Sequence, residues 1–203
     1  MDITQNCDVF VEVSGLLKAL AVNLMKISND LRLLNSGPRG GIGEVVLPEV
    51  QAGSTIMPGK VNPVIAEMVG QVSMRVISND TAITLASGSG QLELNAFTPL
   101  IAECLLESLE LLERSVTIFK EKCIENIKIN EKKCRNNLES STALVTALVH
   151  YIGYDRAAQL AKKALRENKT IKKVLLEEEV LTEEKIDEIM NPYQLTKPGI
   201  PGI

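Results

Sequence analysis

Apolar residues recur at helical spacing along three long stretches of the chain, and segments rich in glycine, proline and polar residues separate these stretches. The first stretch runs from Asp8 to Leu34 without a proline and predicts one long helix, which Gly15 weakens only slightly. Its apolar positions are Val9, Val13, Leu16, Leu17, Leu20, Leu24, Ile27 and Leu31. The helix is expected to end before "NSGPRGGIGE", and "VVLPEVQAGSTIMPGKV" is expected to continue as a loop.

The second helix is expected to begin at Asn62-Pro63, because asparagine is a favoured N-cap and proline suits the first helical position. It is expected to reach about Leu85, with an apolar face made by Val64, Met68, Val72, Val76 and Ile83. The third helix is expected from about Leu94 to Cys123, with Pro99 in its first turn or at a kink. The residues expected on one face of this helix, at helical spacing, are Phe97, Ile101, Cys104, Leu105, Ser108, Leu112, Val116 and Phe119.

Three long helices with apolar stripes predict a helix bundle, and their length suggests that further faces are buried against other subunits. After Asn130 the elements shorten, which predicts a separate small helical domain with Thr182 as an N-cap. The short helices are expected at about 131–138, 141–151, 155–168, 170–178 and 182–190, before the Pro/Gly-rich tail "NPYQLTKPGIPGI". The sequence therefore predicts an all-α protein, with a long bundle followed by a small C-terminal helical domain.

Composition narrows the possible functions. Aromatic residues make up only 3% of the chain and tryptophan is absent, so Leu, Ile, Val, Ala and Met must form the core, which suits packed helices. The net charge of −4 argues against a nucleic-acid partner, and no apolar run is long enough to span a membrane. The start, "MDITQNCDVF", has neither the basic start nor the apolar run of a signal peptide. The four cysteines lack metal-ligand spacing, so we expect no metal site, reduced thiols and a cytoplasmic protein.

The stretch "GSTIMPGKVNPV", from Gly53 to Val64, is unusually polar for a connection between long helices. It could be a plain connector, with a solvated hydroxyl pair and one surface lysine. Its residues also suit an anion site, because Lys60 supplies a positive charge, Asn62 can donate hydrogen bonds, and the N-terminus of the following helix attracts anions. Ser54 could act as a base if neighbouring N–H groups held its alkoxide, and the glycines and prolines would let the loop open and close.

The stretch "GSTIMPGKVNP" resembles the signature loop of the aspartase/fumarase superfamily, whose members usually carry Gly-Ser-Ser-x-Met-Pro-x-Lys-x-Asn-Pro. "NDLRLLNSGPRGGIGE", "NDTAITLASGSGQLELN" and "LTEEKIDEIMNP" are also similar to this family, so the resemblance covers essentially all 203 residues. The family fold has an N-terminal domain, a long central bundle and a small C-terminal helical domain. The resemblance implies that residues 1–129 are the last part of the bundle, including the loop 53–63, and that residues 130–203 are the small domain. The chain would then be the C-terminal portion of a longer enzyme, with Met1 an artificial start.

The family's reaction is a reversible anti β-elimination that yields fumarate and needs no cofactor. The resemblance assigns the base to Ser54, and matches Lys60 and Asn62 to residues that bind the substrate carboxylate. Thr55 stands where the family more often has a second serine, so a hydroxyl contact with substrate is retained but a methyl group is added. The backbone of Ile56 and Met57 is expected to help hold the anion.

Glu67 matches a family carboxylate that pairs with an active-site histidine from another subunit, although an exposed helix charge is the plainer interpretation. Family members are homotetramers whose active sites take residues from three subunits. The only histidine here, His150, is expected to pack or hydrogen-bond within the small domain rather than act in catalysis. The resemblance therefore implies a homo-oligomer that acts on a small dicarboxylate, and a chain that is inactive alone.

The residues on either side of the loop indicate which substrate the family resemblance favours. "LPEVQAGS" and "VNPVIAE", and the ending "NPYQLTKPGI", are more similar to aspartases, which release ammonia from aspartate, than to class II fumarases, which release water from malate. Argininosuccinate and adenylosuccinate lyases share the superfamily, but their flanks fit less well. A non-catalytic helical scaffold derived from a lyase is the alternative of a different class, and it has no need of Ser54, Lys60 and Asn62 together.

Overall fold

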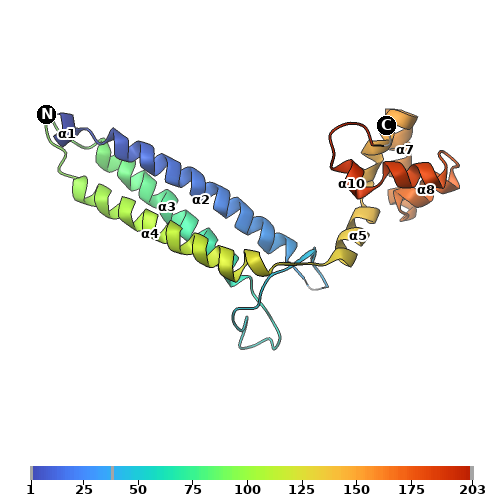
Figure 1. Cartoon of the computed structure of the whole chain (residues 1–203), viewed down its shortest axis with the longest axis horizontal. Coiled ribbons are helices and arrows are strands. Elements are labelled where there is room, and N and C mark those ends of the chain that lie inside the picture. The colour runs from blue at the N-terminus through green and yellow to red at the C-terminus, as the bar shows by residue number, and fades with distance from the viewer. Residues whose placement is uncertain (1, 38, 202–203) are drawn as a thin grey trace. The chain divides into compact units, whose positions relative to one another are not determined.

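The computed structural model describes residues 2–37 and 39–201, and its helices form two compact units that divide between Asn130 and Glu131 (Figure 1). Met1, Pro38, Gly202 and Ile203 lie outside the described residues, and with them the expected break at Pro38 and the last two positions of the expected tail. Helices dominate the described part of both units, so the predicted all-α class is confirmed. No helix within the described residues is long and apolar enough to cross a membrane.

Three long helices make up most of unit 1, which ends at Asn130: α2 (Asp8–Leu34), α3 (Val64–Ser87) and α4 (Thr98–Lys122). A single turn, α1 (Asp2–Gln5), precedes them. The bounds of α2 are those the apolar pattern predicted. Figure 1 shows the three helices running side by side, and α3 packs along both α2 and α4.

The face that α2 and α3 share combines small and polar residues with part of the predicted apolar stripes. On α2 the buried residues are Ser14, Ala21 and Ser28, whereas Leu16 and Leu20 of the predicted stripe are 68% and 43% exposed. On α3, Val76 and Ile83 of the predicted face are buried. The other buried residues of this helix are Ala66, Val69, Gly70, Ser73, Asn79, Asp80 and Ala86. Small side chains let two helix axes approach closely. Leu17, Leu24 and Leu31 of the predicted stripe pack against the buried clusters of unit 1, whereas Leu16 and Leu20 stay on its surface.

A polar network ties α3 to both neighbours. The Asp80 carboxylate, which is 5% exposed, accepts hydrogen bonds from Ser14 Oγ at 2.8 Å and from Lys18 Nζ at 2.6 Å on α2. On the other side, Asn79 Nδ2 donates to Glu107 Oε2 at 2.8 Å and to Ser108 Oγ at 3.1 Å on α4. Because buried polar groups are costly unless they are paired, these contacts fix the register of the three helices.

The turn between α3 and α4 is organised by one buried asparagine. Asn95 Nδ2 donates to the carbonyl oxygens of Ala86, at 3.0 Å, and Ser87, at 3.2 Å, and its Oδ1 accepts from Phe97 N at 2.8 Å. These bonds keep the chain out of helix until Thr98, so the expected start near Leu94 was wrong by four residues. Pro99 lies in the first turn of α4, as expected.

The predicted loop after α2 contains a strand. Val45–Val46 form β1, which pairs antiparallel with β2 (Lys128–Ile129), and Asn130 N donates to Glu44 O at 2.9 Å. The pairing follows α4 and a short 3₁₀ turn, η1 (Ile124–Asn126). Expecting continuous loop here was wrong, because the partner strand lies more than eighty residues later and leaves no local signal.

Unit 2, from Glu131 onwards, has its own core, formed by Leu148, Leu160, Ala164, Ile171, Val174, Leu175, Ile186 and Ile189. Its elements are α5 (Glu131–Ser140), η2 (Thr142–Leu148), α6 (Val149–Ile152), α7 (Tyr154–Glu167), α8 (Ile171–Glu177), α9 (Glu183–Ile189) and α10 (Pro192–Leu195). The predicted N-cap at Thr182 is confirmed, since its side chain accepts from Lys185 N. The single helix expected over 141–151 is instead a 3₁₀ segment followed by one α-turn.

We expect Glu107→Gln to remove part of the acid sensitivity of unit 1. The Arg75 guanidinium, and after it the Asn79 amide, donate hydrogen bonds that hold the pKa of the Glu107 carboxyl below its ordinary value. A carboxyl with a lowered folded pKa stabilises the fold above its unfolded pKa, and this contribution is lost as pH falls through the folded pKa. Because the Glu107 side chain is one-third exposed, the loss should be about 1 kcal/mol or less.

Equilibrium urea unfolding followed by circular dichroism, between about pH 7 and pH 3, measures this effect. The stability of Glu107→Gln should fall less steeply with acid than that of the unsubstituted chain. Glu113→Gln, which changes an exposed carboxylate on the same helix, is the matched control. Equal pH slopes for the chain and for Glu107→Gln would contradict the prediction.

Candidate functional site

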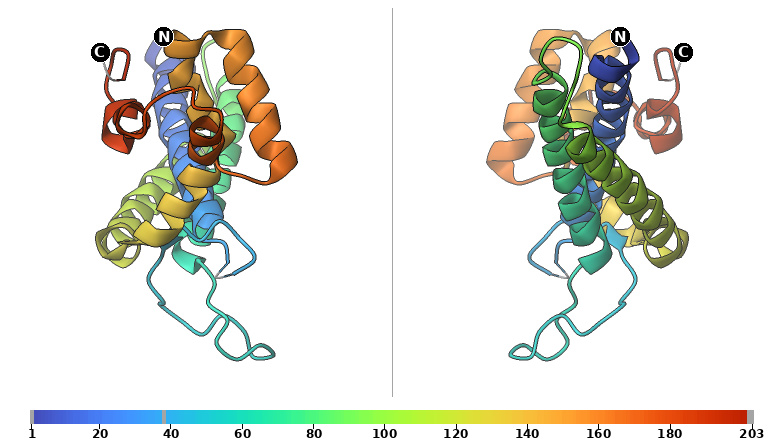
Figure 2. Two further views of the ribbon diagram at one scale, coloured as in Figure 1. Left: turned by 90° about the vertical axis from the view of Figure 1, so that its right-hand side faces the viewer. Right: turned by 90° about the vertical axis from the view of Figure 1, so that its left-hand side faces the viewer.

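The loop 53–63 projects from the end of the bundle at which α2 finishes and α3 begins (Figure 1). Both views in Figure 2 show it extending beyond the helix ends as an irregular excursion of the chain. It is joined to the bundle through β1 on one side and through Pro63 and α3 on the other. This segment holds all the site residues expected from sequence except Glu67.

The loop is closed at its base by a narrow neck. Gly53 N donates to Lys60 O at 2.9 Å, and Asn62 Nδ2 donates to Gly53 O at 2.8 Å. A Cβ atom added at Gly53 would lie 2.3 Å from the Lys60 carbonyl oxygen and 2.9 Å from Asn62 N. Only glycine at position 53 allows the two backbone segments of the neck to pass this closely.

Asn62 does not cap α3, so this part of the prediction was wrong. The residue before the first helical position is Pro63, and it makes no side-chain cap bond. The Asn62 side chain turns back to Gly53, while its backbone oxygen accepts from Val64 N at 2.8 Å. The amide that was expected to start the helix instead holds the loop closed.

Ser54 lies just inside the neck and is the best-positioned nucleophilic or basic group of the loop. Its Oγ accepts hydrogen bonds from the backbone N–H groups of Ile56, at 3.1 Å, and Met57, at 3.2 Å. Lys60 N in turn donates to Met57 O at 3.2 Å, and Gly59 takes a positive φ of 76° that closes this turn. Hydrogen bonds donated to an oxygen favour its anionic form, so this geometry suits a serine that accepts a proton.

The remaining loop side chains face solvent. Ile56 is 87% exposed and Met57 52% exposed, and Thr55 and Lys60 are exposed as well. Within the described residues Lys60 forms no ion pair, so its charge is available to an anion. A cleft of about 380 Å³ adjoins the neck and is lined by Lys60 and Asn62 together with Asn35 and Asn130. The structure thus brings polar donors to one side of the loop base.

Glu67 is on the first turn of α3 and is separate from the Ser54 turn. Its nearest opposite charge is Arg32, at 3.9 Å between Nη2 and Oε1, the outer limit of an ion pair. Within the described residues the Glu67 side chain forms no hydrogen bond to the loop, and only its backbone N–H donates to Pro63 O, at 3.0 Å. The structure therefore groups Ser54, Ile56, Met57 and Asn62 around the neck, and leaves Glu67 on the adjoining helix turn.

His150 is exposed on α6, so the expectation that it packs within the small domain was wrong. The 3₁₀ segment before it turns its neighbour Leu148 into the core and leaves the imidazole outside. Within the described residues, no group of three or more His, Cys, Asp or Glu side chains could hold a metal ion.

Two features that hold the loop were not foreseen from sequence. One is the β1–β2 pairing, and the other is the bond from Leu47 N to Asn35 Oδ1, at 3.0 Å, which anchors the segment entering the loop. Neither has a local sequence signal, because each joins residues that are twelve or more positions apart.

Two family models match the chain. One, described as "Lyase", matches residues 1–78, and the other, described as "Fumarase C C-terminus", matches residues 144–197. The first match takes in the whole loop 53–63. The second lies within unit 2.

Curated relatives are similar over nearly all of the chain. An aspartate ammonia-lyase of Bacillus subtilis (strain 168) is 46% identical over 202 residues, which is 100% of this chain and 42% of that protein. A class II fumarate hydratase of Oceanobacillus iheyensis is 48% identical over 191 residues, 94% of this chain and 41% of that protein. The chain thus spans about two fifths of the length of the curated relatives that it matches.

The fold is likewise similar to solved structures. A crystal structure titled fumarate lyase:delta crystallin from Brucella melitensis, bound to cobalt, matches with a TM-score of 0.90 and 47% identity. The match covers 97% of this chain and 43% of that one.

We expect Gly53→Ala to open the neck, because the new Cβ must displace the Lys60 carbonyl group. The amide proton at residue 53 should then lose the protection that its bond to Lys60 O provides, and exchange at least about tenfold faster. Amide hydrogen exchange followed by mass spectrometry measures this change. Gly40→Ala is the matched control, since no atom lies within 4 Å of a Cβ at that position. Unchanged exchange in Gly53→Ala would show that the neck is not closed in solution.

Proposed function

We propose that this chain, which belongs to the aspartase/fumarase superfamily, is the C-terminal portion of an aspartate ammonia-lyase. The reaction is the reversible anti β-elimination of aspartate to fumarate and ammonia. The observation that carries the proposal is the pair of backbone N–H groups that converge on Ser54 Oγ inside the loop. The relative named aspartate ammonia-lyase, 46% identical along the whole chain, supports the choice of substrate.

Ser54 is the proposed base. As an alkoxide it removes a proton from the substrate carbon next to one carboxylate, and the proton ends on Ser54 Oγ. The electron pair of the broken C–H bond moves into that carboxylate and forms a dianion, after which ammonia leaves the adjacent carbon and fumarate remains. The N–H groups of Ile56 and Met57 lower the cost of the alkoxide because they already point at its oxygen.

Lys60, Thr55 and Asn62 are the proposed contacts of the substrate carboxylate. The unpaired charge of Lys60 beside the neck suits the developing dianion. One N–H of the Asn62 amide is used by Gly53 O, and the second N–H remains for substrate. Asn62 would thus bind substrate and hold the loop closed at the same time.

Glu67 is the proposed partner of a histidine from another subunit. Its contact with Arg32 is long and both side chains are partly exposed, so the carboxylate can accept a stronger donor. In this proposal unit 1 is part of the central bundle of the complete enzyme and unit 2 is its small C-terminal domain. A single copy of the chain would hold only part of each active site.

Homo-oligomerisation is proposed from the surface of the bundle. Leu16 and Leu20 lie on one exposed side of α2, and Leu106 and Leu109 are 65% and 44% exposed on α4. Rows of exposed leucines on long helices are unfavourable in water and favourable in a larger bundle. Further copies of the chain would cover them.

A class II fumarase is the second candidate, because the relative of that name is 48% identical over 94% of the chain. The same base and carboxylate contacts would then remove water from malate. The loop is equally suited to both reactions, since Ser54 would remove a proton from a carbon next to a carboxylate in each and only the leaving group differs.

We expect Ser54→Ala in the complete protein to lower the rate of fumarate formation from aspartate by about 10³-fold, the usual contribution of a general base. Ultraviolet absorbance of fumarate measures the rate, with aspartate and malate supplied separately. Ser78→Ala, an exposed serine on α3 that bonds only its own helix, is the control and should keep full activity. Product from malate alone would identify a fumarase, and full activity of Ser54→Ala would rule out the proposed base.

We expect the 203-residue chain by itself to associate and to show no measurable lyase activity. Leu20→Glu should weaken the association at least about tenfold, because a carboxylate would have to be buried. Sedimentation velocity measures the association constant. Val22→Glu is the matched control: Val22 is similarly exposed, at 50%, but lies about 200° around the helix from Leu20. A monodisperse monomer, or clear turnover by the chain alone, would contradict the proposal.

A further inference from the structure

Unit 2 contains a cleft of about 620 Å³ that the proposed reaction does not use. It lies between α5 on one side and α8, α9 and α10 on the other. Pockets that bind small molecules usually measure about 300–1,000 Å³, combine an apolar lining with a few polar groups, and sit between packed elements. The cleft meets each of these conditions, and all of its lining residues belong to unit 2.

The floor of the cleft is apolar. Leu176, which is 37% exposed, and Met190, which packs against the core of unit 2, both line it. Tyr193 adds an aromatic ring that is 80% exposed at the rim. A bound apolar group would therefore remove a leucine, a methionine and a tyrosine surface from water, which favours binding.

Several polar groups of the cleft already have partners. Lys172 Nζ pairs with Asp187 Oδ1 at 2.5 Å and with Glu183 Oε1 at 3.3 Å, so its positive charge is already matched by carboxylates. The side-chain oxygens of Thr170 and Asn191 accept from the backbone at the starts of α8 and α10. These groups hold the helices in place and have little capacity left for a ligand.

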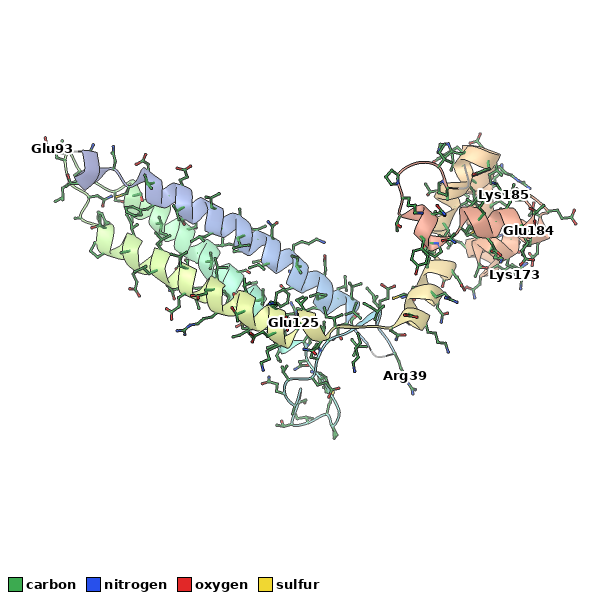
Figure 3. All side chains as sticks on the ribbon, in the orientation of Figure 1. Arg39, Glu93, Glu125, Lys173, Glu184 and Lys185 are labelled. Atoms are coloured by element: carbon green, nitrogen blue, oxygen red, sulfur yellow. The ribbon has the colours of Figure 1, made fainter. Side chains whose placement is uncertain are left out.

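Two cations that line the cleft remain without an ion-pair partner among the described residues. Arg135 on α5 and Lys173 on α8 both line the cleft, and within the described residues neither forms an ion pair. Lys173 is at the surface of unit 2 (Figure 3). Glu139 is the remaining carboxylate of the lining, and it too forms no ion pair within that part of the chain. Arg135 and Lys173 are therefore the two cations of the lining that remain for an anionic ligand.

We propose that this cleft binds a small amphipathic carboxylate. Its anionic head pairs with Arg135 and Lys173, and its apolar body covers Leu176 and Met190. Arginine suits this role because its planar guanidinium can bind both oxygens of a carboxylate. A short dicarboxylate such as fumarate has no apolar body to cover the floor, so the cleft selects a ligand different from the proposed substrate. The inference does not rest on the proposed reaction.

Isothermal titration of the chain with 3-phenylpropionate tests the proposal, because this probe joins one carboxylate to one apolar ring. The alcohol 3-phenyl-1-propanol has the same apolar body without the charge. We expect saturable binding of the carboxylate, with an affinity at least about tenfold above that of the alcohol, since hydrogen bonds to charged groups add this much or more. No saturable binding, or equal affinity for the two probes, would overturn the proposal.

Paired variants locate the binding. Arg135→Gln with Lys173→Gln should weaken binding of 3-phenylpropionate at least about tenfold. Arg166→Gln with Lys162→Gln removes the same two charges from exposed positions of α7 outside the cleft and should leave the affinity unchanged. Circular dichroism confirms that both double variants stay folded. Equal affinity in the two double variants would place any binding outside this cleft.

Discussion

The loop that carries the proposed chemistry depends on one close approach of backbone to backbone, at Gly53. There the chain entering the loop passes the chain leaving it so closely that any side chain would collide with the Lys60 carbonyl group. The approach allows two hydrogen bonds, from Gly53 N to Lys60 O and from Asn62 Nδ2 to Gly53 O. Because the neck is closed, the residues inside it can stay irregular and polar, and Ser54 Oγ can sit against two backbone N–H groups.

The helix bundle of unit 1 holds the two chain segments that form the neck. Its helices are held by small residues such as Ala21 and Ser28, by a buried carboxylate, Asp80, and by buried apolar side chains such as Ile83 and Leu112. This packing brings the helix axes close together and fixes their register through directional bonds. It also leaves leucines such as Leu16 and Leu20 on the outside, where a larger assembly would bury them. The same arrangement accounts for the contacts within unit 1 and for its proposed association with further copies.

Unit 2 is built on a different principle. Short helices surround a compact core of Leu148, Val174, Leu175 and Ile186, and their ends are fixed by side-chain caps at Thr170, Thr182 and Asn191. Caps and ion pairs such as Lys172 with Asp187 stabilise short helices that would not form alone. Because the elements are short, their junctions leave a cleft with an apolar floor and unpaired cations at its edge.

Sequence alone determined the helical class, the bounds of α2, the first turn of α4 at Pro99, the cap at Thr182 and the identity of the residues in the loop, because periodicity, caps and motifs are local properties of the chain. Tertiary structure decided which positions of each predicted stripe are buried, since this depends on where the neighbouring helix packs. It also decided that Val45–Val46 pair with a strand far along the chain, that His150 is exposed, and that Asn62 closes the loop instead of capping α3. The buried faces and the β1–β2 pairing rest on contacts between residues distant in sequence, for which the chain carries no local signal.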